Sequence, residues 1–431
     1  METESGAVTV KWQNWRSFRT SFLQFCNSAI LQWMVVVAVA AMVGYASWRD
    51  GRPTGRRDSP AVVAGRLGSL ATSREGLEAR VRAMDARLAE RPDDVDAAVL
   101  LADALLRQTR VVGNPGLALR AEGVIKQALR EDPGHYGANR MLGSLYLSQH
   151  RFREAIWAAR RNRDARPNDP INDGVIGDAH LELGEYDEAF DAFNRMMRRR
   201  PSAAAYARVA YARELQGNLT GALEAMKLAA DATSAPDVEG IAWHQSQVGE
   251  LLLQIGRVHE AKEAFAAASQ AFPGHPFAVM GYARAVEAEG DVVGAITLLR
   301  ELAGRAPTPD AFARLGELLE RQGENDEAAR FFARAEAAWR SEAPEPKSLA
   351  RFLADRGVKI DEAVRIAERA SADRDDIFTN DALAWSLFKA NRVEEARKAI
   401  ARALRTGTRD RTIREHARAI APAAQHMVSH R

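Results

Sequence analysis

GDAHLELGEYDEAFDAFNRMMRRRP, residues 177–201, places small residues and a closing proline at fixed points among charged, helix-forming residues. A similar arrangement lies 34 residues earlier, in GSLYLSQHRFREAIWAARRNRDARP, residues 143–167. It returns in residues 249–273, 283–307 and 316–340. A repeat of this length indicates one supersecondary unit stacked along the chain. The repeat therefore decides the fold.

Each unit has the features of a helical hairpin. In the opening stretch, Gly177 lies on a first helix, Gly184 can adopt the backbone that ends it, and Pro201 terminates the second helix. Small side chains at Gly177 and Ala189 let the two helices approach closely. Phe193 is then expected to fill the space between neighbouring hairpins.

Two units carry the clearest set of small, apolar and proline positions. They are Leu142, Gly143, Tyr146, Ala155 and Pro167 in one unit, and Val248, Gly249, Ala261, Phe265 and Pro273 in another. At these positions the chain resembles the tetratricopeptide-repeat family. The resemblance covers most of the sequence and implies an all-α fold, a right-handed superhelical solenoid of helical hairpins. It also implies that first helices line the concave side.

About eight full units are expected between Asp93 and Thr406, inside a predicted solenoid of residues 76–421. A terminal repeat has no neighbour on one side and needs a different outer face. Residues 76–92 and 411–421 are therefore expected to be end helices.

Three stretches depart from the repeat pattern. A lengthened turn around Gly113 to Gly116 and a five-residue excess around Ser234 to Gly240 predict two irregular loops. The pattern also blurs in one late unit, although Ala363 and Ala370 still support a paired helix there. Residues 422–431 are expected to be a tail.

The amino-terminal residues predict a single transmembrane helix before the solenoid. Residues 29–48, from Ala29 to Trp48, are apolar and long enough to cross about 30 Å of hydrocarbon. A cleaved signal peptide is the alternative, although its apolar region would be shorter. Residues 1–28 interleave aromatic and basic side chains, as in an interfacial helix or a short disordered tail. Residues 49–75 have the composition of a linker.

Basic residues flank the predicted span on both sides and lean weakly toward a cytoplasmic carboxyl-terminal domain. Long domains can be translocated despite such charges, so the membrane face of the repeats stays open. The Arg- and Ala-rich composition would suit a bacterium with GC-rich DNA. These features together predict a single-pass protein of a bacterial inner membrane.

Composition argues against several functional classes. A formal net charge of +2 creates no global field to attract nucleic acid. The single cysteine, Cys26, excludes a disulfide framework within the chain and a multi-cysteine metal site. The histidines lack metal-binding spacing, and no catalytic or phosphate-loop motif is present. The sequence therefore predicts a non-enzymatic protein without a metal or cofactor.

The concave face is the predicted site of function. A helical stripe through the first helices mixes aromatic, acidic and basic residues, which suits the binding of a protein or peptide partner. The predicted partner-binding residues are Arg140, Asp178, Tyr211, Trp243, Glu250, Phe277, Arg284, Glu317, Phe378, Trp385 and Phe388. Some relatives bind acidic chaperone termini with a Lys and Asn pair. Arg140 and Ser144 do not match that pair, so this ligand is not implied.

Two interpretations of Trp385 stay open. It could anchor a partner, or it could pack against the terminal helix around Ile413 to Ile420, because solenoid ends need covering. For the whole chain, the leading hypothesis is a membrane-anchored scaffold for assembly of an envelope complex. The alternatives are a regulatory adaptor of a membrane enzyme, such as one making envelope polysaccharide, and an enzyme whose active site the sequence does not reveal.

Overall fold

The computed structural model describes residues 72–341 and 346–421. All described residues belong to one compact unit. The predicted membrane span at 29–48, the aromatic segment before it and most of the linker lie outside the described residues. Among the helices that are described, none is long and apolar enough to cross a membrane.

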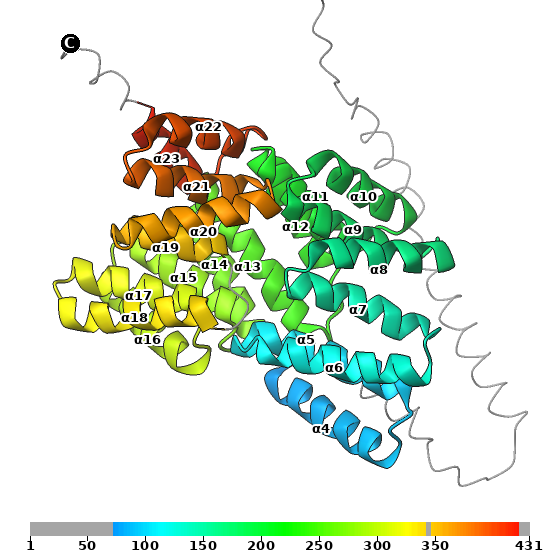
Figure 1. The fold of residues 1–431 in the computed structure, drawn as a ribbon. Coiled ribbons are helices and arrows are strands. Elements are labelled where there is room, and N and C mark those ends of the chain that lie inside the picture. Colours follow the sequence, from blue (N-terminus) through cyan, green and yellow to red (C-terminus); the bar gives the residue numbers. More distant parts are fainter. Residues whose placement is uncertain (1–71, 342–345, 422–431) are drawn as a thin grey trace, which may run out of the picture. The chain divides into compact units, whose positions relative to one another are not determined.

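The described part of the chain consists of twenty α-helices and contains no strand (Figure 1). Eighteen of them pair into nine antiparallel hairpins, each with a first and a second helix. The first helices are α5 (Val95–Val112), α7 (Tyr136–Ser148), α9 (Pro170–Leu183), α11 (Ala203–Leu215), α13 (Val238–Ile255), α15 (Pro276–Ala288), α17 (Pro309–Arg321), α19 (Pro346–Arg356) and α21 (Ile377–Lys389). The second helices are α6 (Gly116–Glu131), α8 (Phe152–Ala165), α10 (Tyr186–Arg199), α12 (Leu219–Asp231), α14 (Val258–Ala271), α16 (Val292–Arg305), α18 (Asn325–Ser341), α20 (Ile360–Asp373) and α22 (Val393–Ala403).

The hairpins pack through the small residues of the repeat. A Cβ placed on Gly177 would lie 2.4 Å from the ring of Phe193, so that ring packs directly on the glycine backbone across its own hairpin. Phe265 extends the same contact between hairpins, because its ring covers Gly249 and also Gly281 of the next unit. Close packing of this kind fixes the distance between helices. The predicted all-α solenoid of hairpins is confirmed.

Single helices lie at both ends of the hairpin array. They are α4 (Arg74–Glu90) and α23 (Arg411–Ile420). The buried residues of α23 are Ile413, His416 and Ile420, which fall on one face. Such a helix covers the apolar side of the last hairpin and turns a polar side to water. The linker ends slightly earlier than expected, because Ser73 caps α4 by accepting a hydrogen bond from the amide of Gly76.

Two details of the repeat pattern differ from expectation. The extra residues before Gly113 do not lengthen a turn. They extend α5 to 18 residues, because Val111 is fully buried and continues the apolar face of the helix. The five extra residues expected around Ser234 to Gly240 do not form only a loop. The loop after α12 covers residues 232–237, and α13 is also lengthened, to 18 residues. The described residues form nine hairpins, against an expectation of about eight, and the blurred unit is the pair of α19 and α20.

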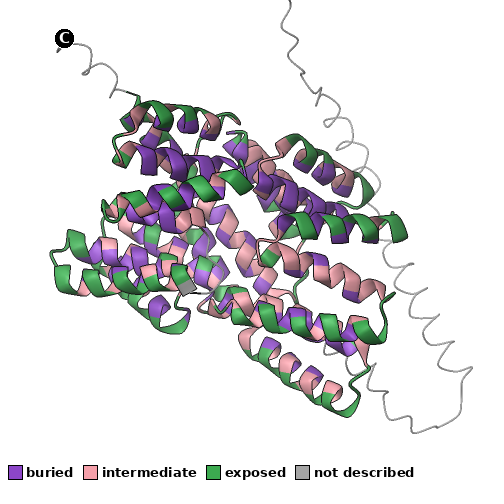
Figure 2. Cartoon of the chain, in the orientation of Figure 1, coloured by how far each residue is buried: buried purple, intermediate pink, exposed green. Residues whose placement is uncertain are grey.

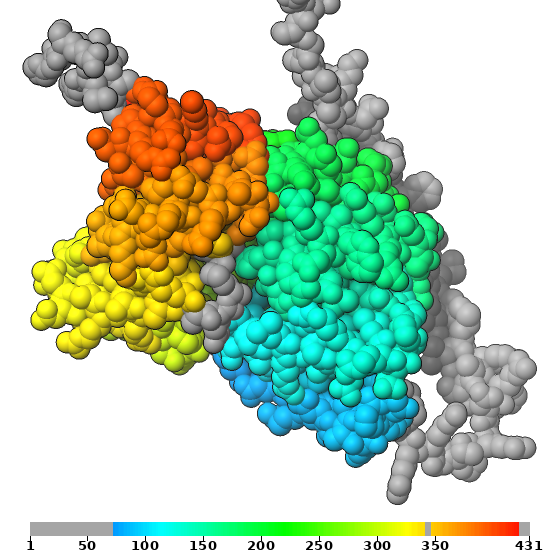
Figure 3. All heavy atoms as spheres, in the orientation of Figure 1, coloured from blue at the N-terminus to red at the C-terminus, as the bar shows by residue number. Residues whose placement is uncertain are grey.

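The turns of early hairpins pack against loops that follow much later in the sequence. The amide of Asp375 donates a hydrogen bond of 3.0 Å to the carbonyl of Leu183. A Cβ on Gly217 would lie 2.4 Å from the carbonyl oxygen of Gly407, and one on Gly113 would lie 2.9 Å from Thr308. In Figure 3 orange and red residues of the late hairpins border green residues of the earlier ones. We call this boundary the seam.

This seam encloses some first helices. Ten of the fourteen residues of α9 and nine of the thirteen residues of α21 are buried, against four of the fourteen in α10. In Figure 2 the second helices α6 and α8 show broad exposed faces instead. A helix buried on most sides belongs to the interior. The concave side is therefore partly occupied by the chain itself.

Candidate functional site

The predicted partner-binding residues occupy equivalent positions in the first helices. Asp178, Tyr211, Glu250, Arg284, Glu317 and Trp385 each follow the small packing residue of their helix by one position. Trp243, Phe277 and Phe378 each precede it by six. Consecutive first helices contact one another from α5 to α9 and from α13 to α15. We call the surface formed by these positions the first-helix face.

Charged residues among the predicted partner-binding residues pair with side chains of neighbouring hairpins. Arg208 donates two hydrogen bonds, of 2.9 and 2.6 Å, to the carboxylate of Asp178. Arg284 donates one of 2.6 Å to Glu250, 34 residues earlier. Arg140 bonds to Asp169 at 3.2 Å. These predicted contact residues already have partners within the chain.

The pairing continues through the later hairpins. Arg314 bonds to both Glu287 and Glu317, and Arg356 bonds to Glu320 at 2.6 and 3.0 Å. Burial would raise the pKa of Glu287, but its bonds with Arg321 and Arg314 outweigh burial and hold that pKa below its ordinary value. Two-point bonds between arginine and carboxylate are geometrically specific. The charges of this face thus fix the register of successive hairpins.

Two aromatic residues of the first-helix face lie on neighbouring first helices in the middle of the array. Trp243 on α13 and Phe277 on α15 are 34 residues apart and hold the same place in consecutive repeats. Trp243 is half-buried against the core, whereas Phe277 is 44% exposed. Phe277 therefore presents an aromatic ring to solvent at the repeat position that Trp243 holds on the neighbouring helix α13. Aromatic side chains of this kind are typical anchors of protein interfaces.

Tyr211 has a different environment from the other aromatic candidates. It packs against the largest apolar cluster, together with Leu181 and Leu215. Burial raises the pKa of the Tyr211 hydroxyl well above its ordinary value, with nearby acidic groups adding to the effect. Its ring therefore contributes mainly to the interior.

Trp385 and Phe388 belong to a polar and aromatic cluster at the carboxyl-terminal end. The ring of Trp385 stacks on His416 of α23 with centroids 4.0 Å apart, and on Phe388 at 5.4 Å. Its indole N–H donates a hydrogen bond of 2.7 Å to Asp355. His416 in turn bonds to Asp381 at 2.9 Å. Of the two interpretations of Trp385, the structure favours packing against the terminal helix.

Phe378 lies at the edge of the same region. It is half-buried against the core, and the ammonium group of Lys347 lies 5.9 Å from its ring. Within the described residues, no group of three or more His, Cys, Asp or Glu side chains is placed to hold a metal ion.

The repeats of this chain match a known family model. The tetratricopeptide-repeat model matches residues 116–170, 175–236, 249–309 and 294–343. These ranges begin or end inside the hairpins described above. The chain is built from tetratricopeptide repeats.

Solved structures show the same fold at low sequence identity. The Cut9–Hcn1 hetero-tetramer of the APC/C matches with a TM-score of 0.51 and 14% identity, over 85% of this chain and 63% of that chain. Human IFIT1 with m7Gppp-AAAA matches with a TM-score of 0.49 and 16% identity, over 73% of this chain and 72% of the other. Yeast Tom70 matches with a TM-score of 0.44 and 14% identity, over 85% of this chain and 88% of the other. No curated protein sequence matches the chain.

Sequence reasoning placed the tetratricopeptide-repeat residues on the right helices but missed their partners. The spacing of 34 between Glu250 and Arg284 is a usable signal, because opposite charges one repeat apart fall on adjacent first helices. No such signal exists for the late loops that cover α9. Their contacts depend on how far each hairpin rotates against the next, which the repeat pattern does not encode.

Proposed function

We propose that the chain is a non-catalytic scaffold, anchored in a membrane, that binds a protein or peptide partner on the first-helix face and helps to assemble an envelope complex. The single observation that carries the proposal is the exposed ring of Phe277 on the first helix α15, at the repeat position that Trp243 holds on α13. An exposed aromatic surface on a stack of repeats is suited to a partner, because solenoids supply extended contact area.

The paired charges of the first-helix face indicate how a partner would bind there. Glu250 and Arg284 lie one to two turns from the aromatic pair and bond to each other. A partner that bound by charge would have to break that bond, whereas one that bound by apolar contact would not. Apolar anchoring is therefore the expected mode, with the charged residues at the rim.

Residues 29–48 carry the membrane part of the proposal, because this apolar stretch is long enough to span a bilayer. The anchor would hold the repeats at a bacterial inner membrane, with a weak lean of the flanking charges toward the cytoplasmic face. A net charge of +2 argues against nucleic acid as the partner.

Co-purification from membranes tests the proposal. The full chain should be recovered from the membrane fraction with a defined protein partner, and deletion of residues 29–48 should release it. Phe277→Ala should weaken the complex about tenfold or more, as for an interface anchor. Val293→Ala is the matched control, because Val293 is 70% exposed on the second helix α16.

Two results would count against it. Equal partner recovery with Phe277→Ala and Val293→Ala would remove the first-helix face from the proposal. Recovery of a single membrane enzyme whose activity depends on the chain would replace assembly with the regulatory adaptor.

A further inference from the structure

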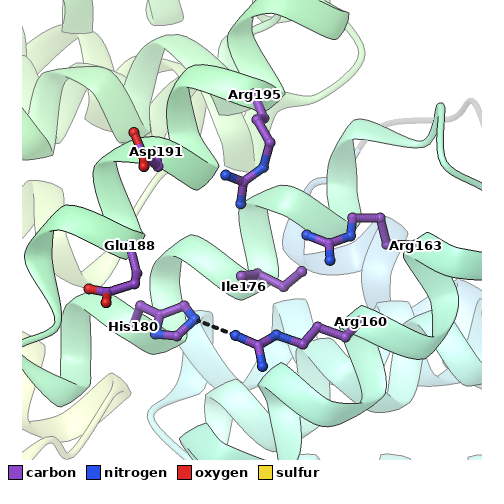
Figure 4. A pocket seen from close by; sticks show the side chains of 7 residues that line it. All are labelled: Arg160, Arg163, Ile176, His180, Glu188, Asp191 and Arg195. Atoms are coloured by element: carbon purple, nitrogen blue, oxygen red, sulfur yellow. Dashed lines mark hydrogen bonds between the residues drawn. The ribbon is translucent and has the colours of Figure 1, made fainter.

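A second surface with binding character lies away from the first-helix face. A cavity of about 340 Å³ opens between the second helices α8 and α10. Its lining residues are Arg160, Arg163, Ile176, His180, Glu188, Asp191 and Arg195. Figure 4 shows the guanidinium groups of Arg160, Arg163 and Arg195 directed toward the space in front of Ile176.

Two of these arginines, Arg163 and Arg195, lie close to the same buried carboxylate. Asp173 on α9 is fully buried and lies 3.1 Å from Arg195 Nε and 3.7 Å from Arg163 Nη1. Arg199 Nε lies 3.3 Å from the other oxygen of Asp173. One carboxylate cannot neutralise three guanidinium groups. The pocket therefore keeps an excess of positive charge at this wall.

Arg160 is held by a different chain of contacts. Its Nη2 donates a hydrogen bond of 3.3 Å to Nε2 of His180, because a guanidinium group can only donate. Nε2 must then be the acceptor, which places the ring proton on Nδ1, facing the carboxylate of Glu185. His180 is buried and fixed in this orientation. Among the described residues, Arg160 thus has no carboxylate within ion-pair distance.

The acidic lining residues do not cancel this charge. Glu188 and Asp191 form no ion pair with any cation in the part of the chain that the structure describes. In Figure 4 their carboxylates lie across the pocket from Arg163 and point away from it. These two carboxylates restrict where an anion can bind, because the anion must approach the arginines and stay away from Glu188 and Asp191.

We propose that this pocket binds an anionic group, a carboxylate or a phosphate, carried by a segment of a protein partner. Guanidinium groups match the planar geometry of carboxylate and phosphate oxygens, and groups already held in place lose little entropy on binding. Trp157 supports a protein segment as the source. It lies one helical turn before Arg160 on α8, is 58% exposed, and is covered by Arg161 at 4.8 Å. A peptide whose anion fills the pocket can lay an apolar residue on that ring.

Binding of labelled peptides to the full chain in detergent tests this proposal. The probes are a peptide with consecutive glutamates, the same peptide with phosphoserines, and a matched glutamine peptide, with inorganic phosphate as a separate ligand. The two anionic peptides should bind and the glutamine peptide should not. Their affinity should fall as salt rises, because exposed charges are screened.

Three variants locate the site. Arg160→Gln should weaken binding of the glutamate peptide about tenfold, which corresponds to about 1.4 kcal/mol. Glu188→Gln should strengthen it, since a repulsive charge is removed. Arg153→Gln is the matched control, because Arg153 is exposed on the same helix outside the lining; its loss removes the same charge and should change affinity less than about twofold.

Arg160→Gln should weaken peptide binding, whereas Glu188→Gln should strengthen it. Damage to the fold would weaken peptide binding in both variants, so this difference distinguishes an effect on binding from an effect on folding. Equal weakening by Arg160→Gln and Arg153→Gln would overturn the pocket, and so would failure of both anionic peptides to bind. Binding of inorganic phosphate without either peptide would overturn the assignment to a protein segment. Trp157→Ala should weaken the peptides and leave inorganic phosphate unchanged.

Discussion

The backbone amide of Ile377 donates a hydrogen bond of 2.9 Å to the hydroxyl oxygen of Tyr186, 191 residues earlier in the chain. Burial raises the pKa of the Tyr186 hydroxyl above its ordinary value. The guanidinium group of Arg405 lies 5.1 Å from the same ring and donates to the carbonyl of Gly184 at 3.1 Å. One tyrosine thus joins the first turn of α21 to the start of α10. The seam between early and late hairpins is a specific interface with its own polar contacts.

Tyr186→Phe tests this seam. Removing the hydroxyl leaves the amide of Ile377 without its acceptor, which should lower the free energy of unfolding by about 1–3 kcal/mol. Urea unfolding followed by circular dichroism measures the loss. Tyr282→Phe is the control, since among the described residues the Tyr282 hydroxyl has no hydrogen bond. An equal loss of unfolding free energy in both variants would show that the hydrogen bond from Ile377 to Tyr186 does not stabilise the seam.

The amino-terminal side of the array should be sensitive to acid through Glu239. Its side chain is buried and bonds to Arg110 at 2.7 Å and Arg107 at 3.1 Å. Burial would raise the pKa of Glu239, but His275 and the charges of Arg110 and Arg107 prevail and hold that pKa well below its ordinary value of 4.5. A depressed pKa in the folded state stabilises the protein above pH 4.5, and this stability is lost as the pH falls below that value.

Glu239→Gln should therefore lower stability at pH 7 by about 2–4 kcal/mol, because two arginines lose their buried partner. The difference from the unsubstituted chain should shrink as the pH falls below 4.5. Urea midpoints measured from pH 7 downward check both statements. Glu263→Gln, at an exposed position on α14, should leave the midpoint at pH 7 unchanged. A pH-independent difference for Glu239→Gln would contradict the charge-based explanation.

Gly177 and Gly123 make opposite predictions for the same substitution. Gly177→Ala puts a methyl group 2.4 Å from Phe193 and should cost about 1–3 kcal/mol by overpacking. Gly123, inside α6, has nothing within 4 Å, so Gly123→Ala should stabilise by about 0.5–1 kcal/mol through helix propensity. Thermal midpoints that move in the same direction would refute the packing role of Gly177.

Trp385 should behave as a structural residue. Trp385→Ala removes the stack on His416 and the hydrogen bond to Asp355, and should lower the free energy of unfolding by about 2–4 kcal/mol. Trp157→Ala should change it by less than about 0.5 kcal/mol, because that ring is mostly exposed. Calorimetry of both variants measures the two changes in stability. An unchanged melting curve for Trp385→Ala would return this residue to the list of partner anchors.

The hairpins themselves could be predicted because their signals are local. Gly177 and Ala189 mark a close helix contact, and Gly184 marks a turn with a left-handed backbone, at φ 81°. The lengthened turn predicted around Gly113 to Gly116 is wrong for a related reason. The buried Val111 prolongs α5 up to Gly113, so the extra residues join the helix. A pattern of small residues does not show which apolar side chain will find a neighbour.

The seam and the arginine pocket could not be predicted. The bond from Ile377 to Tyr186 depends on the accumulated rotation of several hairpins, and small errors in each repeat would move the two residues apart. The pocket depends on side-chain direction. Arg160 and Arg195 occur in basic stretches near helix ends, where cations are common because they favour exposed carbonyl groups. Only the structure separates the arginines that face a cavity from those that face water.

Site-specific photo-crosslinking is the most direct test of a partner on the first-helix face. A benzophenone side chain is placed at position 277 or, as the matched control, at the more exposed position 293 of the full chain in native membranes. The account predicts one strong crosslinked protein from position 277, lost when Trp243 is also changed to Ala, and none from position 293. Crosslinks of equal strength from both positions, or from position 293 alone, would contradict it.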